Sequence, residues 1–141
     1  MDNLKKIIWN DELSVGNSDI DIDHKQLIEI YNELIDFNET DRNRKDFALI
    51  LSKMTAYCFV HFTKEEEYME KMGYPDLVAH KRLHKEYIYK VAQYNIGLLS
   101  ANPPQIHEVI DFLKYWWVNH ILEKDMKYKA FKIENKSDAK Y

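Results

Sequence analysis

Apolar residues recur at steps of three and four positions in four segments of the chain, at about 20–37, 43–72, 76–100 and 104–130. This spacing places the apolar side chains of each segment on one face of an α-helix, because a helix turns once in about 3.6 residues. A half-buried strand would need alternating apolar and polar residues, and no segment sustains that alternation. The pattern therefore predicts four amphipathic helices.

The four apolar faces define the predicted core of an all-α protein. In chain order, its members are Leu27, Ile28, Tyr31, Leu34, Ile35, then Phe47, Ile50, Leu51, Met54, Cys58, Phe62, Met69, Met72, then Leu77, Tyr87, Ile88, Val91, Leu98, and finally Ile106, Val109, Ile110, Leu113, Trp116, Trp117. Four helices with one apolar face each and short connections predict an antiparallel up-down-up-down bundle.

Turn-forming residues separate the predicted helices. Residues 73–75 contain a glycine and a proline, residues 103–104 are both proline, and residues 38–43 form a polar run. An irregular N-terminal arm, residues 1–18, precedes the first helix. With no internal repeat or linker, we expect a single domain over residues 1–141.

Charge and composition limit the kinds of partner. The chain has 141 residues, of which 45% are hydrophobic and 31% charged, with a formal net charge of −4. These values are typical of a globular domain, and the negative charge without a basic cluster argues against a nucleic-acid partner.

The single cysteine, Cys58, cannot form an internal disulfide and fits a reducing compartment. Because it lies on an apolar face, we expect a buried, unreactive thiol. The N-terminus lacks the apolar core of a signal peptide, and no stretch is long and apolar enough for a membrane helix. We therefore expect a soluble, cytoplasmic protein without membrane insertion. Separately, we expect it to be a monomer.

Five of the six histidines fall on the predicted apolar faces. They are His24, His61, His80, His84 and His120. Glu65 follows His61 by four residues, so the two side chains lie one turn apart on the same face. His107 lies off the apolar face of its segment, and we expect it to be exposed.

One buried histidine is usually hydrogen-bonded to a carbonyl group, and one His/Glu pair is usually a surface pair. Five imidazoles and a carboxylate converging from all four helices are different, because burying them unpaired would cost several kcal/mol. A bound metal removes that cost. Asp125 would complete the site, although it follows His120 by five residues, an awkward step of about 140° on a regular helix. A local distortion of the helix, or side-chain reach near its end, could bring it inward.

Nitrogen-rich ligation with two carboxylates suits iron, zinc or copper better than magnesium or calcium. Seven ligands are too many for one tetrahedral zinc, so two metals sharing the carboxylates is the natural solution. No Glu-x-x-His motif is present, which argues against the ferritin-like di-iron pattern, and no HExxH motif indicates a zinc protease.

Three stretches resemble the hemerythrin family, specifically its prokaryotic single-domain members. They are IDIDHKQLIEIYNEL, HFTKEEEYMEKMGYPDLVAHKRLH and FLKYWWVNHILEKDMKY. The resemblance runs from about Ile7 to Phe131, and the order H, HxxxE, HxxxH and HxxxxD on four helices is highly specific, although each piece alone is weak. It also accounts for the five-residue step to Asp125.

The resemblance implies a non-haem di-iron centre with an oxo or hydroxo bridge. His80, His84 and His120 would bind one iron, and His24 and His61 the other. Glu65 and Asp125 would bridge the two ions. One coordination position would stay open on the iron with two histidines, and the family binds dioxygen there. The residues implied to line that position are Leu27, Phe62, Trp116, Trp117 and Ile121.

Trp117 departs from the family, which usually has an aliphatic residue, commonly leucine, three positions before the last histidine. An indole there could narrow the pocket, slow ligand access or donate its N–H to a bound ligand.

The implied function is reversible dioxygen binding for storage, delivery or sensing, with delivery to an oxygen-using enzyme that the sequence does not identify. The alternative is a di-iron redox enzyme that uses the same site as a peroxidase, an oxidase or a nitric oxide reductase. A third reading is an iron store or an iron-regulated sensor module. The sequence shows no further cofactor motif or substrate pocket, which favours a binding protein over an enzyme.

Overall fold

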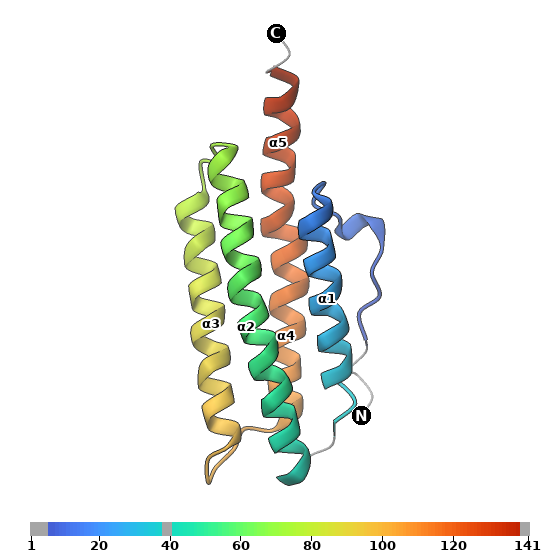
Figure 1. The fold of residues 1–141 in the computed structure, drawn as a ribbon, viewed down its shortest axis with the longest axis vertical. Coiled ribbons are helices and arrows are strands. Elements are labelled where there is room, and N and C mark those ends of the chain that lie inside the picture. The colour runs from blue at the N-terminus through green and yellow to red at the C-terminus, as the bar shows by residue number, and fades with distance from the viewer. Residues whose placement is uncertain (1–5, 38–40, 139–141) are drawn as a thin grey trace.

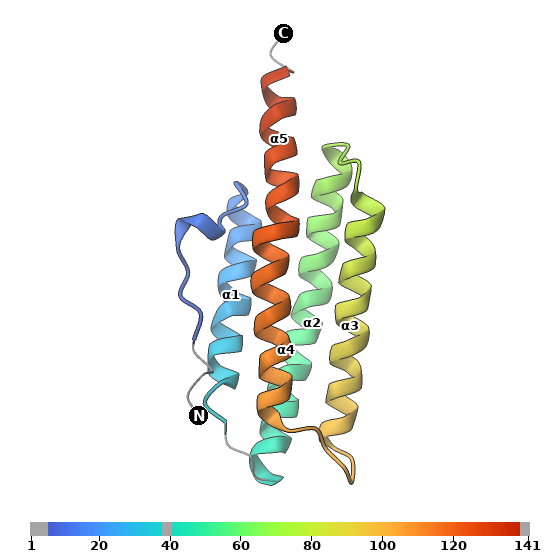
Figure 2. The same ribbon diagram turned by 180° about the vertical axis from the view of Figure 1, so that it is seen from behind.

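The computed structural model describes residues 6–37 and 41–138. Its elements are η1 (Asp11–Leu13), α1 (Ser18–Leu34), α2 (Asp41–Lys71), α3 (Leu77–Leu98), α4 (Ile106–Asn119), η2 (His120–Asp125) and α5 (Met126–Asp138). Helices α1, α2, α3 and α4 lie side by side, and α5 continues α4 beyond the end of the bundle (Figures 1 and 2). The prediction of an all-α four-helix bundle is confirmed.

The fourth predicted helix, at 104–130, differs from the structure. It begins at Ile106, passes through a π-helical turn at His120–Asp125, and ends at Asp138. The predicted polar turn at 38–43 falls partly outside the described residues, and α2 begins within it, at Asp41.

The turns follow from local backbone chemistry. Gly73 adopts a φ of 71°, a left-handed conformation that ends α2 and that glycine accepts without steric cost. Asn17 caps α1, since its side chain accepts a hydrogen bond from the backbone N–H of Ile20.

The N-terminal arm lies along α1 (Figure 1). The side chain of Asn32 holds it, because its amide oxygen accepts the N–H of Ile7 at 2.8 Å and its amide nitrogen donates to the Ile7 carbonyl at 2.9 Å. Val15 is 1% exposed and packs in a small apolar cluster with Tyr128. The arm thereby contributes a buried apolar side chain to this cluster.

The interior is divided between apolar packing and a polar layer. One end is filled by aliphatic and aromatic side chains such as Leu34, Phe47, Leu51 and Val109, each fully buried. Cys58 is buried there too, and burial raises the pKa of its thiol to about 12, as expected of an unreactive cysteine. None of the described helices is long and apolar enough to cross a membrane.

Candidate metal centre

All seven predicted ligand side chains meet in the polar layer of the bundle. Each is 4% exposed or less: His24, His61, Glu65, His80, His84, His120 and Asp125. They come from α1, α2, α3 and η2, so no helix alone could form the group. His107 is exposed, as predicted.

A π-helical turn brings Asp125 to the site. From His120 to Asp125 the backbone forms the wider turn of a π-helix, which is frequent at functional sites. This distortion removes the awkward rotation that a five-residue step has on a regular helix. Asp125 Oδ1 then lies 3.1 Å from His120 Nε2 and 3.0 Å from His80 Nε2.

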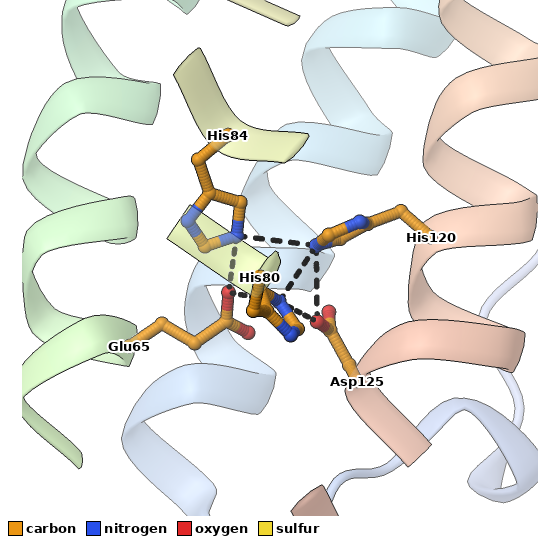
Figure 3. A group of neighbouring side chains, drawn as sticks. All are labelled: Glu65, His80, His84, His120 and Asp125. Atoms are coloured by element: carbon orange, nitrogen blue, oxygen red, sulfur yellow. Dashed lines mark hydrogen bonds and ion pairs between the residues drawn. The ribbon is translucent and has the colours of Figure 1, made fainter. Parts of the chain in front are cut away.

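Three imidazoles and two carboxylates form a compact group (Figure 3). His120 Nε2 lies 3.1 Å from the Nε2 atoms of both His80 and His84, and His84 Nε2 lies 3.1 Å from Glu65 Oε1. The ligand atoms of these residues and Asp125 all lie within 4.8 Å of one another. Neighbouring ligands at about 2.1 Å from a shared cation are separated by about 3 Å, so the spacing matches a coordination sphere.

His24 and His61 form a second group with Glu65. Their Nε2 atoms lie 3.6 and 3.8 Å from Glu65 Oε2, and His24 Nε2 lies 3.4 Å from Asp125 Oδ2. In both carboxylates one oxygen therefore faces the three-histidine group, and the other oxygen faces the two-histidine group or a member of it. The carboxylates stand between two candidate cation positions.

Several buried atoms in this layer have no hydrogen-bond partner among the described residues. They include both ring nitrogens of His24, Nε2 of His61 and Oδ2 of Asp125. Each unsatisfied buried polar group costs about 1–3 kcal/mol. So many at one place indicate that a bound cation is the missing partner.

The charges of the cluster depend on one another. Burial by itself lowers the pKa of His24, but contacts with Asp125 and Glu65 raise it to about 10. Burial also opposes protonation of His84, but hydrogen bonds to Glu65 and Glu66 raise its pKa to about 9. Without a metal, protons bound to His24 and His84 would supply the positive charge that balances the buried carboxylates.

Three further side chains, none of them predicted from the sequence, support the candidate ligands. Asp23 Oδ2 accepts a hydrogen bond from His61 Nδ1 at 3.1 Å. The same oxygen forms an ion pair with Lys64 Nζ at 2.9 Å. Glu66 lies 2.8 Å from His84 Nδ1, and Tyr128 donates to Glu65 Oε2 at 2.7 Å. Carboxylates behind ligand histidines fix the ring orientation and raise ligand basicity.

Of these three supporting residues, Tyr128 could have been found from the sequence, because it follows Asp125 by three residues on the same face. Asp23 and Glu66 could not, because each contacts a histidine on a different helix.

Three of the five predicted pocket residues lie beside the rings of candidate ligand histidines. Phe62 stacks on His84 with ring centroids 3.8 Å apart, and Trp116 stacks on His120 at 4.2 Å. The ring of Trp117 lies 6.2 Å from that of His24 and 6.1 Å from that of His61. Leu27 and Ile121 are each 2% exposed and belong to the same core, whereas Trp116 is only partly buried.

Fold and site together define a metal-binding four-helix-bundle protein. Residues 15–131 match the family described as the Hemerythrin HHE cation binding domain. The chain belongs to the hemerythrin family.

Its similarity to individual proteins extends over most of its length. It is 35% identical to the bacteriohemerythrin of Clostridium acetobutylicum over 125 residues, which cover 86% of this chain and 97% of that protein. It is 32% identical over 122 residues to a hemerythrin-like protein of Naegleria gruberi, covering 86% and 90% of the two chains. A crystal structure of wild-type hemerythrin superposes with a TM-score of 0.81 at 28% identity, covering 89% of this chain and 97% of that one.

Proposed function

We propose that the protein binds dioxygen reversibly at a non-haem di-iron centre, for storage, delivery or sensing. The observation that carries the proposal is the arrangement of Glu65 and Asp125, whose paired oxygens face separate groups of histidines. Two shared carboxylates and five imidazoles suit two transition-metal ions of intermediate softness rather than one. Membership of the hemerythrin family favours iron over zinc and copper.

The ligand assignment follows the two groups. His80, His84 and His120 would hold one ion, His24 and His61 the other, and Glu65 and Asp125 would bridge them. Held there in the ferrous state, two iron ions would supply the two electrons that dioxygen accepts on binding. The position with fewer histidines is the one at which a small molecule could bind.

Side chains around the centre orient the ligands and exclude water. Asp23 and Glu66 fix the rings of His61 and His84 by hydrogen bonds to their Nδ1 atoms. Phe62 and Trp117, each 4% exposed, cover the centre with apolar surface. A dry surrounding slows loss of the reduced state, since water and protons promote oxidation of an oxygen-binding centre.

Metal analysis and optical spectroscopy test the proposal. We expect about two irons per chain, since seven ligands fit two ions, and oxo-to-iron charge-transfer bands in the near ultraviolet in the oxidised form. Air admitted to the reduced protein should change the spectrum, and removing oxygen should restore it. One zinc per chain, or a change that does not reverse, would contradict the proposal.

Turnover assays separate this function from the enzymatic alternative. Steady-state consumption of peroxide or nitric oxide by the reduced protein would identify a catalyst at the same site. A binding protein shows only stoichiometric reaction in both assays.

A further inference from the structure

A cavity of about 420 Å³ opens between α2 and α3 beside the candidate metal centre. Phe59 and Phe62 line it from α2, and His84, Tyr89 and Ala92 line it from α3. A volume of this size is far larger than a diatomic gas needs and lies in the range of about 300–1,000 Å³ found for sites of small organic molecules. The cavity is therefore large enough for an organic ligand.

The walls of this α2–α3 cavity are suited to a planar aromatic molecule. Phe59 is 58% exposed and Tyr89 is 67% exposed, so each helix presents one large ring that no other part of the described chain covers. Aromatic rings pair best by offset stacking or edge contact with a second aromatic ring. An aromatic ligand would cover both rings at once.

A lysine adds a preference for negative charge. Lys85 lines the cavity and forms no ion pair with any other residue that the structure describes. The acidic residue in the lining, Glu66, already has a partner, because its carboxylate lies 2.8 Å from His84 Nδ1. The ammonium group of Lys85 is thus available to an anionic substituent on the ligand.

The inner wall of the cavity is part of the candidate metal centre. His84 lines the cavity while its Nε2 atom faces Glu65 and His120 inside the bundle. Phe62 lies parallel to the His84 ring, with centroids 3.8 Å apart and planes 6° apart. A ligand in the cavity would therefore be in contact with the ring of a candidate iron ligand, or one stacked ring away from it.

We propose that the α2–α3 cavity binds a planar aromatic hydroquinone with an anionic substituent, and that this carrier restores the reduced state of the centre. The hydroquinone would give up two electrons and two protons. Its electrons would pass by way of His84 and reduce two ferric ions to two ferrous ions, its protons would pass to solvent, and the resulting quinone would leave. The reduction step rests on the proposed di-iron centre, whereas binding in the cavity does not.

Binding is tested with anthraquinone-2-sulfonate, which has a planar ring system and one negative charge. We expect saturable binding to the oxidised protein and to the metal-free protein, measured by calorimetry. The Ala92→Trp variant places an indole in the cavity and should weaken binding about tenfold or more. Gln93→Trp is the matched control, because Gln93 is exposed on the same helix but does not line the cavity.

The role of charge is tested with a neutral ligand. Lys85→Gln should weaken binding of the sulfonate but leave binding of 2-(hydroxymethyl)anthraquinone unchanged. Equal losses for the two ligands would overturn the assignment of Lys85.

Reduction is tested by stopped-flow mixing of the oxidised protein with the reduced form of the same probe. The rate should saturate with probe concentration, and at concentrations well below saturation Ala92→Trp should slow it by the same factor as it weakens binding. Reduction by dithionite, which does not need the cavity, should be unchanged in both tryptophan variants.

Two results would overturn this proposal. Absence of saturable binding, or equal affinity in Ala92→Trp and Gln93→Trp, would exclude the cavity as the site. Weaker binding in Ala92→Trp than in Gln93→Trp, but with equal reduction rates in the two variants, would exclude electron transfer through it. Failure of the proposed di-iron function would give a different result. The protein would then have the wrong metal content, but the anthraquinone probe would still bind to the metal-free protein.

Discussion

Trp117 stands at the position where the resemblance to the hemerythrin family leads one to expect an aliphatic residue. Its indole N–H donates to the hydroxyl of Tyr87 at 2.9 Å, so in this structure it does not point to a ligand at the centre. The ring nevertheless lies near His24 and His61, the two histidines of the less crowded group. Of the three effects that the sequence left open, donation to a ligand is therefore not favoured, and a narrower pocket with slower ligand access stays a prediction.

Replacing Trp117 by leucine should open the pocket. The change removes several buried heavy atoms and leaves space that a small ligand or water can occupy, at a cost in stability of about 1–3 kcal/mol. We expect faster azide binding to the oxidised protein and faster autoxidation, with unchanged iron content, since no candidate ligand is altered. Stopped-flow absorbance measures both rates, and equal rates in wild type and variant would show that Trp117 is ordinary core.

Tyr87 should influence ligand access to the centre by holding the indole of Trp117 in place. It is 1% exposed, and its hydroxyl accepts the indole N–H, so Tyr87→Phe leaves a buried donor unsatisfied at a cost of about 1–3 kcal/mol. We expect a lower melting temperature and a smaller increase in azide binding rate than in Trp117→Leu, because the indole remains but is less firmly held. Tyr115→Phe is the control, since Tyr115 is 73% exposed on α4. Equal melting temperatures and equal azide binding rates in the two phenylalanine variants would show that Tyr87 does not hold Trp117 in place.

His61 and His107 provide the contrast that tests the ligand assignment. His61 is 1% exposed and belongs to the two-histidine group, whereas His107 is exposed near the start of α4. His61→Ala should therefore reduce iron occupancy and oxygen binding, because it removes one of the only two imidazoles proposed to hold the second ion. His107→Ala should change neither. Iron analysis and oxygenation spectra decide, and full iron with normal oxygenation in both variants would refute the assignment.

At the scale of helices, the periodicity of apolar residues was enough to predict the bundle. Leu27, Leu34, Phe47 and Leu51 are buried where their spacing placed them, because a core-facing stripe is a local consequence of the helical repeat. The same stripes placed His24 and the other four candidate ligand histidines in the interior. Fold and candidate ligands could thus be predicted together, since both depend on one regular period.

The π-helical turn could be anticipated only as a possibility. The five-residue step from His120 to Asp125 showed that a regular helix would misplace the carboxylate, but spacing alone does not distinguish a distorted backbone from a long side-chain reach. The extension of α5 to Asp138 was also missed, because the residues after Phe131 are mostly polar and carry no apolar stripe. The contacts of Asp23 and Glu66 join different helices, so no local pattern reveals them.

For the whole molecule, the metal should be part of what stabilises the fold. The interior holds five imidazoles and two carboxylates, several of whose buried atoms have no partner within the described chain. A ligand that binds only the folded state stabilises it by RT ln(1 + [L]/Kd), which reaches several kcal/mol for tight binding. Removing iron should therefore lower the melting temperature by roughly ten degrees or more. Thermal unfolding of the two forms measures this, and equal melting temperatures would contradict a buried site.

The metal-free protein should also lose stability at alkaline pH. The pKa of His24 rises from 6.5 to about 10 on folding, and that of His84 from 6.5 to about 9, because both rings lie against buried carboxylates. A raised pKa favours the folded state fully below pH 6.5, and this contribution is lost as pH rises through about 9 and then about 10. The thiol of Cys58 acts in the same direction above pH 9, since its pKa rises to about 12 and only the unfolded chain ionises readily.

Urea unfolding of the metal-free protein at about pH 7, 8.5 and 10 measures this decline. In the Cys58→Ala variant the part due to the histidines should remain, which separates the two contributions. The iron-loaded protein should show a shallower dependence, because its imidazole nitrogens would bind metal instead of protons. A metal-free protein equally stable at the three pH values would mean that His24 and His84 do not hold protons against Glu65 and Asp125, and the polar layer would then need a different charge arrangement.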